Sequence, residues 1–196
     1  MTELQAVNVM LRAIGSSTVS SMDVGLPDVA NARETLREQN KLVQARGWWF
    51  NTEYGVVYQP NSTTKEISIG RDVEKLEQPS TVVSKRGTKL FNMETNSYQF
   101  DTPVKFQKVV RILPWENIDD SVQRAVLYGA VVQFVEDEVG DKGKAEKWER
   151  KAMQAYSQLV SNDLASAGHN VLDRQRILRA RAGVRPYNRG RINRWR

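Results

Sequence analysis

The sequence contains no cysteine among its 196 residues and only one histidine, His169. Without cysteine the chain can form no disulfide, no thiolate metal site and no thiol nucleophile, which excludes several classes of enzyme. The histidine stands in the string SAGHN, and no serine and acid accompany it in the arrangement that a histidine base requires. We therefore interpret His169 as a loop residue and expect no catalytic activity, no bound metal and no cofactor.

Long apolar runs are also missing. No stretch approaches the roughly 18 apolar residues that are needed to cross a bilayer, and a content of 27% charged and 40% hydrophobic residues is typical of a soluble globular protein. The first residues, MTELQAVNVML, lack the basic start and the small-residue cleavage site of a secretory signal. We expect a soluble protein that has no membrane partner.

The net positive charge of the chain is confined to its C-terminal end. The whole chain carries a formal charge of +6, but residues 173–196 contain nine arginines and one acidic residue. Residues 1–172 are left with 20 basic and 22 acidic side chains, a net charge of −2. The body of the protein is therefore slightly acidic, and its charge gives no reason to expect an electropositive surface for nucleic acid.

Apolar residues at spacings of three and four predict helices in two separate parts of the chain. Pro27 and Asp28 suit the first turn of the second helix, and Gly47 suits the position just beyond its C-terminus. Only a few residues separate the third helix from the fourth, so these two should form an antiparallel hairpin. The predicted helices cover approximately residues 3–14, 27–46, 119–139 and 144–167.

The region of about residues 54–112 has a period of two, which predicts short strands. The expected runs are 54–58, 66–68, 81–84, 89–93 and 104–112. In the last run Val104, Phe106, Val110 and Ile112 share one side, as in a half-exposed strand. Because the strands follow one another without helical crossovers, the fold class is α+β: a four-helix bundle-like body with a small, mostly antiparallel sheet inserted between its helices. We predict one domain over residues 1–172, followed by a basic extension over residues 173–196.

Three motifs suggest a site and have a simpler structural interpretation. Paired Trp48 and Trp49 could stack on bases, but aromatic residues after a helix C-cap usually fold back into the core. The string VGDKGKAEK lacks the spacing of a phosphate loop and is interpreted as a turn between helices. The acids at 136–138 and Asp141 lack the alternation of a calcium loop and are interpreted as a solvated helix end.

Several strings resemble one protein family in content and order. The N-terminal third resembles tail tubular protein A of short-tailed, podovirus-type phages at Ala13–Gly15 and above all at Gly47–Glu53, the string GWWFNTE. Further matches are the strand Val109–Ile112, the proline Pro114 before a helix, and Asn170–Leu172. The resemblance covers approximately residues 3–172, although the sheet is too variable to match residue by residue.

The resemblance implies a structural virion protein rather than an enzyme. Members of that family form a ring of twelve copies that adapts the portal protein at the capsid vertex to the tail nozzle protein, tail tubular protein B. The viral DNA passes through the central channel without sequence-specific binding. A protein of this kind belongs to the virion tail and is assembled in the host cytoplasm.

The arginine-rich end, RPYNRGRINRWR, is the candidate binding segment. Arginines form bidentate pairs with carboxylates, and interspersed aromatic and apolar residues can anchor an interface, so we expect it to bind the portal or a neighbouring subunit. A nucleic-acid-binding module that uses the same segment is the alternative hypothesis. The candidate residues are Arg185, Tyr187, Arg189, Arg191, Ile192, Arg194, Trp195 and Arg196.

Overall fold

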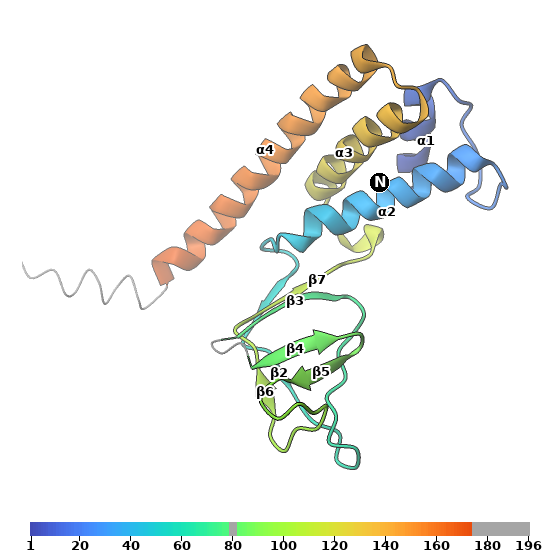
Figure 1. Ribbon diagram of the computed structural model, residues 1–196. Coiled ribbons are helices and arrows are strands. Elements are labelled where there is room, and N and C mark those ends of the chain that lie inside the picture. The colour runs from blue at the N-terminus through green and yellow to red at the C-terminus, as the bar shows by residue number, and fades with distance from the viewer. Residues whose placement is uncertain (79–81, 174–196) are drawn as a thin grey trace, which may run out of the picture.

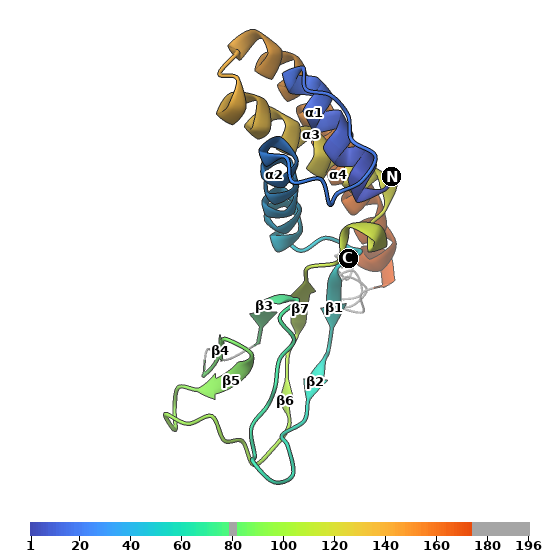
Figure 2. The same cartoon turned by 90° about the vertical axis from the view of Figure 1, so that its right-hand side faces the viewer.

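The computed structural model describes residues 1–78 and 82–173, with side chains described as far as residue 166. Its helices gather in one body, and the strands form a second part that projects from one end of that body (Figures 1 and 2). The α+β class predicted from the sequence is confirmed. The helices are α1 (Glu3–Ile14), α2 (Pro27–Ala45), α3 (Asp120–Glu138) and α4 (Lys142–Asp173), with a short 3-10 helix, η1 (Trp115–Asn117), before α3.

Local chemistry explains where the helices begin and end. Thr2 and Gln5 form a reciprocal capping box at the start of α1, and Gly15 closes its end with a φ of 89°. Pro27 occupies the first turn of α2, where its missing N–H costs nothing. The Asp141 carboxylate accepts hydrogen bonds from the backbone N–H groups of Gly143 (3.0 Å) and Lys144 (3.1 Å), which caps α4.

The fourth helix is longer than predicted. It continues past residue 167 to Asp173, so the loop prediction for His169 is wrong. The helix was predicted to end at about residue 167, but Gly168 does not stop it, because a glycine inside a helix costs only about 1 kcal/mol relative to alanine. Favourable neighbours such as Ala165 and Ala167 let the helix run through it.

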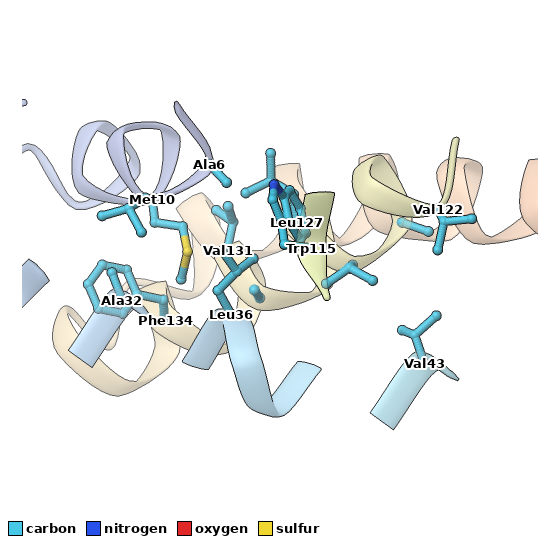
Figure 3. Packing of buried hydrophobic residues seen from close by; sticks show 14 of the residues in the cluster. Ala6, Met10, Ala32, Leu36, Val43, Trp115, Val122, Leu127, Val131 and Phe134 are labelled. Carbon is cyan, nitrogen blue, oxygen red and sulfur yellow. The ribbon is translucent and has the colours of Figure 1, made fainter. Parts of the chain in front are cut away.

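The helical core surrounds α3. Phe134 and Val131 of α3 pack against Met10 of α1 and Leu36 of α2, and Trp115 of η1 closes the same cluster (Figure 3). Figure 1 shows α4 running antiparallel beside α3, as the short connection predicts. Because its neighbours cover it on several sides, α3 is buried over most of its circumference rather than along one stripe. Val139, at helical spacing with the buried residues of α3, ends the helix and is exposed, and Val132 is half-buried.

All strand pairings are antiparallel. The order β1-β7-β3 forms a three-stranded sheet with β7 in the centre, and two further pairs, β2-β6 and β4-β5, extend away from it. A second cluster of buried residues, including Ile67, Leu90, Phe106 and Val109, lies within this β region. The strands are β1 (Thr52–Tyr54), β2 (Val57–Tyr58), β3 (Val73–Glu77), β4 (Val83–Arg86), β5 (Lys89–Asn92), β6 (Val104–Lys105) and β7 (Lys108–Arg111).

The β region differs from the prediction in several places, and the predicted run 54–58 is split between β1 and β2. The sequence pattern missed β3 entirely, and residues 66–68 form only isolated bridges. The long run 104–112 is broken into β6 and β7, and the alternation of a half-exposed strand holds only as far as Lys108, because the adjacent Val109 and Val110 are both fully buried. Val109 belongs to the β-region cluster, whereas Val110 lies against the loop at Gly47 on the helical side. The central strand is thus covered on both faces.

Candidate assembly surfaces

The arginine-rich segment predicted as the binding site lies outside the described residues. This holds for every candidate in it: Arg185, Tyr187, Arg189, Arg191, Ile192, Arg194, Trp195 and Arg196. Its role therefore stays a prediction.

The motifs that suggested chemistry have structural roles. Asp141 caps α4, so the string VGDKGKAEK contains the predicted turn between two helices, at residues 139–141, and continues as the first residues of α4. Within residues 1–78 and 82–173 there is no group of three or more histidine and acidic side chains placed to hold a metal ion. No helix in this part of the chain combines the length and the apolar character that crossing a membrane requires.

The GWWFNTE string forms the joint between the helical body and the β region. Trp48 is 1% exposed, and its indole Nε1 donates to the Val43 carbonyl at 2.6 Å. Trp49 and Phe50 are half-buried and pack edge to face, with ring centroids 5.2 Å apart. The Trp49 backbone N–H donates to Asp163 of α4 at 3.1 Å. These aromatics therefore pack the joint, which confirms the packing interpretation.

Asn51 is the buried centre of that joint. Its amide Nδ2 donates to the carbonyls of Gln44 (2.9 Å) and Arg111 (2.7 Å), and its Oδ1 accepts from the Trp48 N–H at 2.8 Å. Gln44, also buried, accepts from the Leu113 N–H at 2.8 Å and donates to the Leu113 carbonyl at 2.9 Å. One pair of side chains thus ties the end of α2 to both chain segments that connect the helices to the sheet.

A second network, at the surface, joins the strands beside this joint. The Arg111 guanidinium bridges Glu53 (2.9 Å) and Asp72 (2.7 Å) and lies 3.5 Å from the Tyr58 hydroxyl. Its hydrogen bond lowers the pKa of the Asp72 carboxyl, while the two carboxylates, Asp72 first, raise the pKa of Arg111. Burial raises the pKa of Tyr58. The network stabilises the charged forms of Asp72 and Arg111 and links β1 and β7 to the residue that precedes β3, which is a structural role.

An apolar open surface lies between α2 and α4, with α3 as its floor. We call this the α2–α4 groove, a hollow of about 560 Å³. Leu42 of α2 and Met153 of α4 line the groove, and these residues are exposed by 68% and 67%. On the floor, Gln39 of α2 covers Gly129 of α3 so closely that an added Cβ would lie 2.4 Å from its amide nitrogen. The groove is lined by Gln39, Leu42, Val43, Arg46, Ala125, Gly129, Glu149, Ala152, Met153 and Tyr156.

Polar contacts fix one end of the groove. Arg46 donates to the Tyr156 hydroxyl at 2.8 Å and lies over the Trp48 ring at 4.6 Å from its centroid. Trp48 and Tyr156 pack edge to face, with ring centroids 5.8 Å apart. These contacts fix the tyrosine ring as one side of the groove. Among the described residues, the ionisable side chains that line the groove are those of Arg46, Glu149 and Tyr156. This composition suits binding of an apolar partner and offers no nucleophile with a base beside it.

Sequence reasoning missed the groove because its exposed residues lie beside the buried stripes. Leu42 directly precedes the buried Val43, and Met153 follows the half-buried Ala152 of α4. Tyr156 and Leu164 of α4 stand at helical spacing from Ala152 and are nevertheless exposed by 40% and 66%. The sequence feature that could have indicated the groove is a large apolar residue next to a buried stripe. Single exposed apolar residues are too common, however, to identify a site.

Comparison with known proteins agrees with the resemblance seen in the strings. The profile of the family described as tail tubular protein matches residues 4–169. The tail tubular protein A of Klebsiella phage KP34 is 26% identical over 176 residues, which cover 84% of this chain and 88% of that protein. The match includes both the helical body and the β region. The chain therefore belongs to the tail tubular protein family, a family of structural proteins of the phage tail.

Proposed function

We propose that the protein is a head-to-tail adaptor that forms a ring, of twelve copies, between the portal and the tail nozzle protein and surrounds the DNA exit channel. The family match over residues 4–169 is the observation that carries this proposal. Under it, the protein is assembled in the host cytoplasm and resides in the virion tail.

The two-part shape supports an adaptor. A ring subunit needs different surfaces for its lateral neighbours and for the proteins above and below it, because a closed ring uses head-to-tail lateral contacts. The helical body carries the α2–α4 groove, and the β region projects away from it (Figures 1 and 2). The Asn51 joint hydrogen-bonds the end of α2 to the start of the connection back from the β region, so we expect one subunit to present an end contact and a lateral contact together.

Charge supports passage of DNA rather than tight binding. Residues 1–172 carry a net charge of −2, and fixed lysines and arginines in a channel would add salt-sensitive attraction to the duplex. The basic extension is then assigned to a protein contact. Its residues from Arg185 to Arg196 would bind acidic surface on the portal or on the neighbouring subunit.

Electron microscopy of the purified protein, alone and mixed with portal, tests this function. We expect rings, and we expect deletion of residues 174–196 to weaken portal attachment in a pull-down. A protein that stays monomeric even with portal would refute the adaptor role. Duplex affinity that falls steeply with salt and vanishes with the same deletion would favour the nucleic-acid-binding alternative.

A further inference from the structure

The loop between α1 and α2 carries an exposed apolar projection, residues 23–26. Val24 and Leu26 are exposed by 40% and 49%, and a Cβ added at the intervening Gly25 would meet nothing within 4 Å. The Leu26 N–H donates to the Val24 carbonyl at 2.8 Å, which bends the projection into a compact turn. Ser16 donates to Asp28 at 2.8 Å and ties its base to the end of α1. This is a defined apolar surface that faces solvent.

The projection and the α2–α4 groove lie at opposite ends of α2. Leu26 immediately precedes the helix, and Leu42 of the groove follows 16 residues later, which corresponds to about 24 Å at 1.5 Å per residue. Figure 1 shows the loop at one end of α2 and the lower half of α4 beside the other. Because a helix separates them, the two surfaces cannot meet within one subunit, but they can meet between two copies.

Opposite charges accompany the two surfaces. Asp23 is exposed in the projection, and Arg46 stands at the end of the groove. Among the described residues Asp23 forms no ion pair, and Arg46 bonds the neutral Tyr156 hydroxyl rather than a carboxylate. A binding segment with an apolar turn and an adjacent carboxylate therefore matches both the apolar lining of the groove and the positive charge of Arg46.

We propose that residues 23–26 of one copy dock in the α2–α4 groove of the next copy. Val24 and Leu26 then cover Leu42 and Met153, and the Asp23 carboxylate pairs with the Arg46 guanidinium. The contact joins two different surfaces, so it is heterologous and repeats around a ring. It deepens the proposed adaptor function, on which it rests, by assigning the lateral interface.

Cysteine cross-linking tests the contact directly, because the natural chain has no cysteine. The variants carry Leu26→Cys with either Leu42→Cys or Met153→Cys, and they are oxidised after ring assembly on purified portal. We expect a ladder of covalent multimers on a non-reducing gel, since each copy links to two neighbours. A matched control pairs Leu26→Cys with Leu164→Cys, whose site on α4 is as exposed as Met153 but lies outside the groove.

The pattern of products decides among the possible occupants. Intact rings without a ladder from either groove pair, or an equal ladder from the control pair, would overturn the proposal. Dimers alone would also overturn it, because a two-fold contact would then join the copies. Efficient linkage of Met153→Cys to Trp195→Cys within one chain would assign the groove to the C-terminal segment instead. Wild-type protein that never forms rings would refute the adaptor function separately.

A charge placed in the groove gives an independent readout. Met153→Asp should leave the melting temperature unchanged, because the side chain is 67% exposed in the subunit. It should weaken ring assembly by at least about tenfold, since docking would bury an unpaired carboxylate in apolar surroundings. Leu164→Asp should assemble normally. Normal assembly of Met153→Asp would contradict the proposal.

Discussion

Replacing Asn51 by alanine should uncouple the helical body from the β region at a large cost in stability. The side chain is 3% exposed and makes three hydrogen bonds, to the Trp48 N–H and to the carbonyls of Gln44 and Arg111. Each bond contributes about 1 kcal/mol net, and a buried group left without a partner costs about 1–3 kcal/mol. Because the Trp48 N–H sits in the buried joint, we expect a loss of roughly 3–4 kcal/mol in the free energy of unfolding.

Urea unfolding, followed by far-UV circular dichroism and by tryptophan fluorescence, measures this loss. Coincidence of the two transitions supports two-state treatment of the helical body and the joint, which carry the tryptophans. For a chain of this size the expected loss lowers the melting temperature by roughly 10 °C, at about 2–4 °C per kcal/mol. Asn117→Ala, at an exposed position in η1, is the control and should change little. A loss below about 1 kcal/mol for Asn51→Ala would refute the joint as a stabilising centre.

Two further predictions concern the neighbourhood of the same joint. Gly47→Ala should destabilise by more than Gly87→Ala: both glycines have positive φ (79° and 62°), but only at Gly47 would the added Cβ clash, at 2.7 Å from Val110 Cγ2. Equal melting temperatures for these two variants would contradict the close packing of β7 on the loop. The lowered pKa of Asp72 contributes stability that is present above its unfolded pKa of about 3.9 and is lost as the pH falls through its lower folded value. Asp72→Asn should therefore flatten the acid limb of the stability curve, and an unchanged limb in acid titration would count against the Arg111 network.

The sequence pattern was sufficient to predict the positions of the helices, because caps and apolar spacing involve residues that are close together in the chain. The capping box at Thr2 and the apolar spacing of α1 and α2 are visible in short windows. Strand β3 was missed for a physical reason: its pairing with β7 shifts register between Val73 and Lys75. An irregularity of this kind inserts an extra residue, so the apolar Val73 and Leu76 stand three apart and do not show the period of two.

The surfaces were less accessible to sequence reasoning than the fold. Val109 and Val110 are adjacent and both buried, since one faces the β-region core and the other faces the loop at Gly47. The residues around Val110 do not indicate that the loop at Gly47, about 60 residues earlier in the chain, covers its second face. The α2–α4 groove has the same origin, because it exists only where α2, α3 and α4 meet. The family strings, by contrast, identified the class of protein directly.

The joint also makes the β region an insertion that could be removed or replaced without unfolding the helical body. The chain leaves the helical body and returns to it at neighbouring positions, since the Arg111 N–H donates to the Asn51 carbonyl at 2.9 Å. The helical body and the β region keep separate buried clusters. We expect that a short turn in place of residues 53–110 would leave the helices able to fold, and that a foreign module with similarly close ends could be grafted at this point. The far end of the adaptor could then be exchanged while its lateral contacts stay the same.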